Sequence, residues 1–161
     1  MKPRVYVETS ILSYLTALPS RDIIQAARQQ ITIGWWVRRD EFDLFLSDPV
    51  LTEARRGDPA AAARRLGAAA GIAVLSGAKE AEALAAALIK KAAMPPKAIV
   101  DAAHVAIAAV HGLDFLLTWN CTHIANATMR PRIEAVCRDS GFRPPVICTP
   151  DELQEEEEEK K

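Results

Sequence analysis

The chain has 161 residues, about half of them apolar, and a formal net charge of −1. A chain of this length can bury one core, and it contains neither the roughly 18 to 20 consecutive apolar residues of a membrane helix nor an apolar leader. Its three cysteines form no CxxC pair, which argues against a disulfide framework or structural zinc. We therefore expect one cytoplasmic domain with no membrane contact.

The charge is unevenly distributed along the chain. Residues 151–161 contain seven acids and two lysines, a net charge of −5, so residues 1–150 carry +4. A mildly basic body is compatible with a polyanionic partner but is weak evidence for one. We expect a folded domain over residues 1–150 and a disordered or frayed acidic tail over 151–161.

The first third of the chain predicts two strands, each followed by helix. Residues 4–7 form a short β-branched and aromatic run that ends at Glu8, and residues 11–17 follow with a helical pattern. A longer helix is expected from a cap at Ser20 to about Asp40. Residues 42–46 predict the second strand, and Ser47-Asp48-Pro49 predicts a capped helix in which Glu53 lies early.

The rest of the chain continues this alternation. Pro95-Pro96 interrupts one helical pattern, and Gly112 is expected to end the next. The expected helices are 59–69, 81–88, 97 or 99 to 111, and 130–140, and the expected strands are 72–75, 115–118 and 146–148. Strands that alternate with helices predict an α/β fold with a central parallel sheet of about five strands, covered on both faces.

Several polar residues are predicted to meet at one edge of this sheet. Ligands of parallel sheets bind at the carboxyl ends of the strands. Glu8 ends the first strand, Glu53 belongs to the helix after the second, and Asn120 follows the fourth. Asp101 joins them if its helix begins at the same edge. Hard cations such as Mg²⁺ take carboxylate oxygens in phosphodiester chemistry, so Glu8, Glu53 and Asp101 are candidate metal ligands.

Three segments resemble the PIN-domain family, and more closely its VapC-like ribonuclease toxins of type II toxin-antitoxin systems. They are VYVETSILSYLT at 5–16, SDPVLTEARRG at 47–57 and DAAHVAIAAVHGLDFLLTWN at 101–120. The resemblance implies a PIN-like α/β/α sandwich whose clustered acids bind Mg²⁺ or Mn²⁺ and hydrolyse RNA, with a 3′ oxygen as the leaving group. It places Glu8, Glu53 and Asp101 at the first three acidic positions.

The sequence departs from the family pattern at two of these positions. Glu8 stands where the family usually has aspartate, so its carboxylate reaches one methylene further. Asn120 stands where many members have a fourth acid, and its amide brings no negative charge. With three carboxylates, we expect one tightly held cation, and a second ion only together with substrate. Asn120 is either a turn residue or a catalytic residue that orients water or substrate.

Other polar residues are candidates for supporting roles or for packing. The residues expected to contact substrate or to orient the metal ligands are Thr9, Ser10, Thr118 and His123. His104 and His111 are seven residues apart on one helix, without zinc-ligand spacing, and are interpreted as packing or surface residues. Trp35 continues an apolar stripe and is expected in the core or an interface.

The carboxylates and the resemblance together predict a metal-dependent endoribonuclease, and the resemblance also implies toxin activity. A cognate antitoxin is then expected to cover the site through the helical hairpin between Ile11 and Trp35, and homodimers are common in the family. One alternative is a catalytically inactive PIN-like RNA-binding or scaffold module, which Asn120 motivates. A metal-dependent phosphatase is a second alternative, although no Asp-x-Asp or P-loop motif accompanies the acids.

Overall fold

The computed structural model describes residues 1–155, and residues 156–161 lie outside the described part. Within it, one sheet of five parallel strands has the order β3-β2-β1-β4-β5. The strands are β1 Arg4–Val7, β2 Asp43–Ser47, β3 Ala73–Leu75, β4 Phe115–Leu117 and β5 Val146–Cys148. The predicted α/β architecture with a five-stranded parallel sheet is confirmed.

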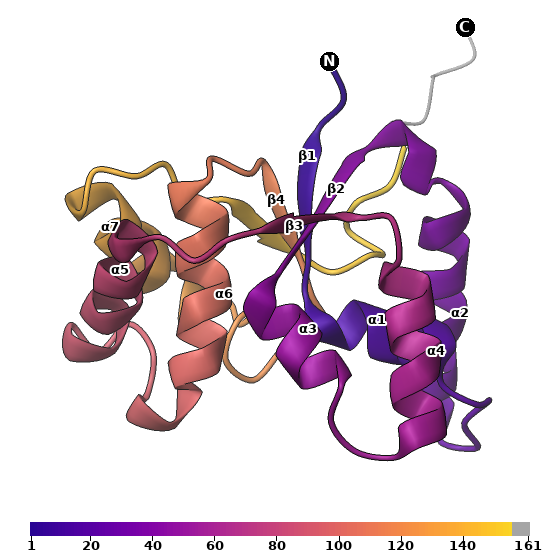
Figure 1. Ribbon diagram of the computed structural model, residues 1–161. Coiled ribbons are helices and arrows are strands. Elements are labelled where there is room, and N and C mark those ends of the chain that lie inside the picture. Colours follow the sequence, from indigo (N-terminus) through magenta and orange to yellow (C-terminus); the bar gives the residue numbers. More distant parts are fainter. Residues whose placement is uncertain (156–161) are drawn as a thin grey trace, which may run out of the picture.

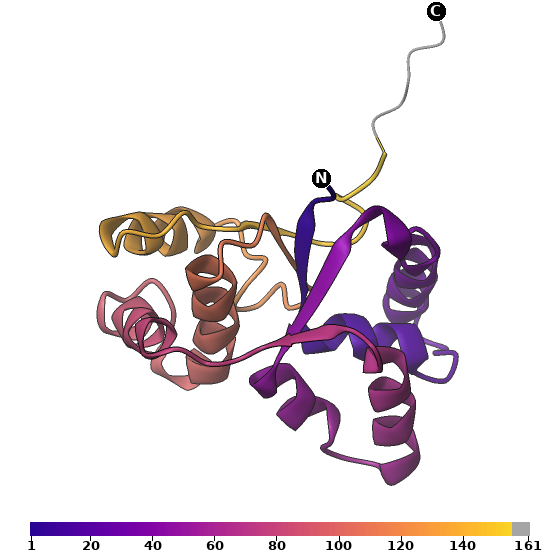
Figure 2. The same ribbon diagram turned by 45° about the horizontal axis from the view of Figure 1, so that its top comes forward.

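Helices cover both faces of the sheet (Figure 1). One group contains α1, α2 and α4, and the other contains α5, α6 and α7; the turned view in Figure 2 shows the same division. Their bounds are α1 Thr9–Thr16, α2 Ile23–Val37, α3 Asp48–Ala54, α4 Pro59–Ala69, α5 Lys79–Lys90, α6 Ile99–Val110 and α7 Arg130–Asp139. The short helix α3 contacts α1, α4 and α6, so it bridges the two groups.

The core explains why helices pack on both faces. Successive side chains of a strand point to opposite faces, and Val5, Tyr6 and Val7 of β1 are all fully buried. Helix α6 is buried along most of its length and ends before Gly112, which has a φ of +66° that glycine adopts without steric cost. Trp35 is buried and stacks on Phe42 at 5.5 Å between ring centroids, so the prediction of a core position is confirmed.

The predicted helix after Ser20 is wrong at both ends. Its N-cap is Asp22, whose carboxylate accepts the Gln25 N–H at 2.9 Å, while the Ser20 hydroxyl accepts the Asp22 N–H in the preceding turn. The α-helix ends at Val37, and a 3₁₀ turn over Arg39–Glu41 replaces the rest of the predicted helix. Competing local side-chain bonds of this kind set helix ends within a few residues.

The predicted position of Glu53 within its helix is also wrong. Ser47 caps α3, because its Oγ accepts the Val50 N–H at 3.4 Å. The helix has only seven residues, however, so Glu53 lies in its last turn. Gly57, with a φ of +85°, then turns the chain toward α4. Glu53 is therefore far from the positive helix end, and its charge needs other stabilisation.

The described part of the acidic tail lies against the domain. Leu153 packs on the core, and a Glu155 carboxylate oxygen lies 3.2 Å from Arg38 Nε. Most of the predicted tail, residues 156–161, is outside the described residues, so its disorder stays a prediction. Among residues 1–155, we find no helix that is long and apolar enough to cross a membrane.

Candidate metal site at the carboxyl edge of the sheet

Glu8 lies at the end of the central strand and is almost completely buried. It is 5% exposed and serves as the N-cap of α1, so its carboxylate accepts the Ser10 N–H at 2.9 Å. The hydroxyls of Ser10 and Thr118 donate to its other oxygen, at 2.6 and 2.5 Å. Three donors offset the cost of burying a carboxylate. Ser10 and Thr118, predicted to orient the ligands, do contact Glu8.

Glu53 reaches the same place from the last turn of α3. Its Oε1 accepts the Thr9 hydroxyl at 2.8 Å and lies 2.5 Å from His104 Nε2. Partial burial alone would raise the pKa of Glu53, but the hydrogen bonds from His104 and Thr9 and the charges of His104 and Arg56 lower it below its ordinary value. Glu53 is thus held as a carboxylate.

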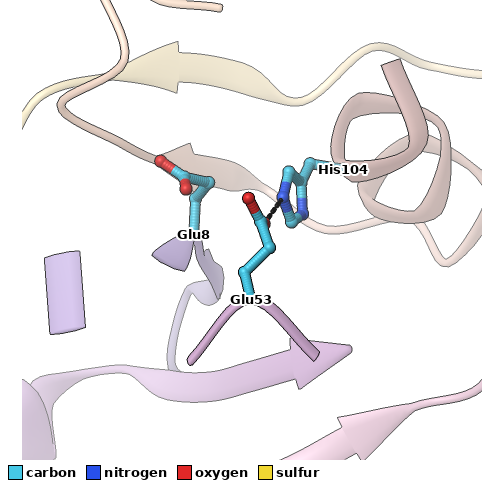
Figure 3. Close-up of side chains that lie close together, drawn as sticks. All are labelled: Glu8, Glu53 and His104. Atoms are coloured by element: carbon cyan, nitrogen blue, oxygen red, sulfur yellow. Dashed lines mark hydrogen bonds and ion pairs between the residues drawn. The ribbon is translucent and has the colours of Figure 1, made fainter. Parts of the chain in front are cut away.

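Glu8, Glu53 and His104 form one cluster (Figure 3). Their candidate ligand atoms all lie within 4.8 Å of one another, and in this view the Glu53 side chain lies between the other two. They come from the end of β1, the end of α3 and the first half of α6. Residues far apart in sequence therefore converge where β1 and β4 end, as predicted for two of the three acids.

His104 is the member of this cluster that the sequence analysis missed. It is 0% exposed, and its Nδ1 lies 2.7 Å from the Tyr6 hydroxyl. Burial alone would lower the pKa of His104, but the hydrogen bond to Glu53 and the charges of Glu8, Glu53 and Asp101 outweigh it and raise the pKa. One signal was available, because His104 follows Asp101 by three residues and therefore lies on nearly the same helix face.

Asp101 stands beside the cluster rather than in it. It lies in the first turn of α6, as predicted, and its Oδ2 lies 3.1 Å from His123 Nδ1. Its charge contributes to the raised pKa of His104, which reflects their proximity. Asp101 is not part of the group whose ligand atoms lie within 4.8 Å of one another, so its role as a metal ligand stays a prediction.

Asn120 makes the contacts of a turn residue. Its Oδ1 accepts the His123 N–H at 3.0 Å, and its own N–H donates to Thr118 Oγ1 at 2.9 Å. The Asn120 carbonyl also accepts the Ala125 N–H at 2.8 Å. This side chain orders the loop that carries His123 toward Asp101. The turn alternative is thus observed, and a direct catalytic role for Asn120 stays a prediction.

The two glutamates retain oxygen lone pairs for a cation. A carboxylate has about four lone-pair positions. Glu8 Oε1 accepts two hydroxyls, whereas Oε2 accepts only the Ser10 N–H. Glu53 Oε1 accepts Thr9 and His104, and its Oε2 accepts no hydrogen bond from any residue in 1–155. Carboxylate oxygens that are not fully used, on the buried Glu8 and the half-buried Glu53, suit a hard divalent cation, so the residues present fit Mg²⁺ or Mn²⁺.

Comparisons with known proteins agree on the fold. No family model matches the sequence, and no curated protein matches it. The crystal structure of Mycobacterium tuberculosis VapC20, a sarcin-ricin loop cleaving toxin, is similar with a TM-score of 0.58 and 17% identity, over 86% of this chain and 95% of that one. A chain of Rickettsia felis VapBC2, crystallised with a DNA fragment from its promoter, is similar with a TM-score of 0.55 and 11% identity, over 91% of this chain and 98% of that one.

Identities this low bear on architecture and not on activity, and the two likenesses extend over nearly the whole of the described chain. The architecture thus has a known counterpart, and we conclude that the chain has the PIN-like α/β/α fold of the VapC structures.

Proposed function

We propose that the protein is a metal-dependent endoribonuclease that hydrolyses RNA phosphodiester bonds, with Glu8 and Glu53 as metal ligands. The observation that carries this proposal is the pair of carboxylates at the carboxyl edge of the sheet, with Glu8 buried and Glu53 half-buried, each with oxygen lone pairs left open. Two carboxylates held this close repel each other, and a bound cation would offset that repulsion. The chain shares its fold with VapC20, a sarcin-ricin loop cleaving toxin, so a fold of this kind can carry RNA cleavage.

The surrounding residues prepare the site for a cation. Mg²⁺ or Mn²⁺ bound there would polarise a phosphoryl oxygen and lower the pKa of water. The Ser10 and Thr118 hydroxyls fix one oxygen of Glu8, and Thr9 fixes one oxygen of Glu53. Asp101 is proposed as the third acid, held by His123 at the rim. The carboxylates therefore need little reorganisation when the ion binds.

Basic residues around the end of α3 support a polyanionic substrate. The charge of Arg56 acts on Glu53. Arg65 donates to the carbonyls of Ala54 and Arg56, which fixes the backbone there, while Arg56 itself is exposed. Exposed arginines beside an acidic metal site offer contacts for RNA phosphates.

We also propose that the protein acts as the toxin of a toxin-antitoxin pair. The likeness to VapC20, a toxin, and to a VapBC2 chain supports this. Helix α2, which packs on α1, has exposed apolar residues that an antitoxin segment or a second copy of this chain would cover. They are Ile23, Ile24, Ile33 and Val37. Ile23, Ile24 and Ile33 lie within the hairpin where the antitoxin was expected, and Val37 lies just beyond it.

The test is cleavage of a mixed RNA pool by purified protein with Mg²⁺, Mn²⁺ or EDTA. A Glu8→Gln/Asp101→Asn double variant removes two negative charges from the site and is expected to lose cleavage. Glu80→Gln, an exposed acid on α5, is the matched control and should cleave as wild type does. If the folded wild type cuts no RNA with either metal but still binds RNA, the proposal fails and the inactive binding module takes its place.

A further inference from the structure

A polar network runs from Glu53 of the proposed metal site into the core, and its other three side chains, Ser47, Tyr6 and His104, are fully buried. Tyr6 of β1 and His104 of α6 are both 0% exposed, and the Tyr6 hydroxyl lies 2.7 Å from His104 Nδ1. The same hydroxyl lies 2.5 Å from Ser47 Oγ, and His104 Nε2 lies 2.5 Å from Glu53 Oε1. Four side chains therefore form one continuous chain of hydrogen bonds, from Ser47 to Glu53.

The two ends of this chain are the two ends of α3. Ser47 is the N-cap residue of the helix, and Glu53 lies in its last turn. Seven helical residues span about 10 Å. The hydrogen bond of Tyr6 to Ser47 holds the first end of α3 against the sheet, and that of His104 to Glu53 holds its last turn against α6. A helix this short has marginal stability of its own. The direction in which the Glu53 side chain points thus depends on contacts outside the helix.

From this arrangement we propose that His104 is a positioning residue, which works with Tyr6 to hold the Glu53 carboxylate toward Glu8. The inference rests on the proposed function, since Glu53 is there a metal ligand. The Glu53 carboxylate only accepts hydrogen bonds, so His104 Nε2 donates to it. This bond occupies Oε1 and leaves Oε2 for the cation.

The same contacts argue against His104 as a direct metal ligand, although its Nε2 lies in the cluster. Both ring nitrogens already have partners, Tyr6 on one side and Glu53 on the other. Ligation would require Nε2 to lose its proton and its bond to Glu53. A histidine that donates to a ligating carboxylate instead orients that carboxylate, and loss of such a partner typically lowers metal affinity about 10- to 100-fold.

Three variants separate these roles. His104→Leu removes both hydrogen bonds and should weaken Mn²⁺ binding about 10- to 100-fold, measured by titration with electron paramagnetic resonance. His104→Gln can still donate to Glu53 and should recover most of the affinity. Tyr6→Phe keeps the packed ring but frees the imidazole and Ser47, and should cause a smaller loss. Equal losses in His104→Gln and His104→Leu would overturn the inference.

Two further measurements keep the inference separate from the proposed function. Electron spin-echo spectra of the Mn²⁺ complex should contain no signal from a directly bound histidine nitrogen, and such a signal would overturn positioning. Crystal structures of metal-free wild type and His104→Leu should show the Glu53 carboxylate turned away from Glu8 only in the variant. An unmoved Glu53 would overturn positioning even if wild type binds Mn²⁺. If Glu53 is displaced in His104→Leu but the wild type binds no Mn²⁺, the positioning role of His104 is supported and only the proposal of a metal site is refuted.

Discussion

The Ser10 hydroxyl joins three parts of the site, and its removal gives the clearest test of how they are held together. Ser10 Oγ donates to Glu8 at 2.6 Å and accepts the Trp119 N–H at 2.8 Å. It thereby connects the end of β1 and the start of α1 with the loop after β4. Ser10→Ala leaves the Glu8 charge with one donor fewer and the Trp119 N–H without its acceptor.

The expected loss follows from these two bonds. A hydrogen bond to a charged group contributes about 1.5 to 3 kcal/mol and a neutral one about 1 kcal/mol. Ser10 is only partly buried, so water will replace part of both bonds. We therefore expect Ser10→Ala to lower the free energy of unfolding by about 2 to 3 kcal/mol, which corresponds to a fall in Tm of about 4 to 12 °C.

Ser13→Ala is the matched control on the same helix. Its hydroxyl donates only to the Thr9 carbonyl one turn earlier, at 3.2 Å, and such a bond adds little to a helix. We expect a change within about 0.5 kcal/mol. Urea denaturation of the three proteins without metal measures both values. If Ser10→Ala were as stable as Ser13→Ala, Ser10 would not join these segments as described.

Three further predictions concern the rest of the fold. Burial raises the pKa of Cys137 to about 11 and of Cys148 to about 12, so a thiol reagent at neutral pH should modify exposed Cys121 first and the other two only after unfolding. Hydrogen bonds from the Arg4 N–H and from Arg143 lower the pKa of Asp114. The stability that Asp114 adds is complete above its ordinary pKa of 3.8 and is lost as pH falls through the lower pKa of the folded state. The difference in free energy of unfolding between wild type and Asp114→Asn should therefore become smaller as the pH is lowered. A difference that does not change with pH would contradict this. Leu116 of β4 is fully buried, so Leu116→Ala should lower the free energy of unfolding in urea by about 2 to 5 kcal/mol, and a loss below about 1 kcal/mol would contradict the core assignment.

The sheet was predictable because its signals are local. The apolar run Val5–Val7 ends at a polar residue, and the five runs of this kind match the observed strands to within about two residues. Parallel order followed from their alternation with helices. Glu8 could be placed for the same reason, since a residue that ends a central parallel strand lies at the ligand-binding edge.

The rest of the site depends on contacts that no local pattern encodes. Glu53 was placed early in its helix because the Ser47 cap signal is strong, whereas the helix ends after seven residues. His104 looked like a packing residue because its neighbours in α6 are apolar. Its partners are Tyr6, 98 residues away, and Glu53, 51 residues away. Pairings this distant become visible only when the chain is folded.

The most direct test of the account is a crystal structure of the protein soaked in Mn²⁺, with the ion located by its anomalous scattering. The account predicts one well-occupied peak in contact with a carboxylate oxygen of Glu8 and with one of Glu53, and no such peak in Glu8→Gln. An ion held elsewhere, or no ion between these two side chains at millimolar Mn²⁺, would contradict the claim that they form the metal site.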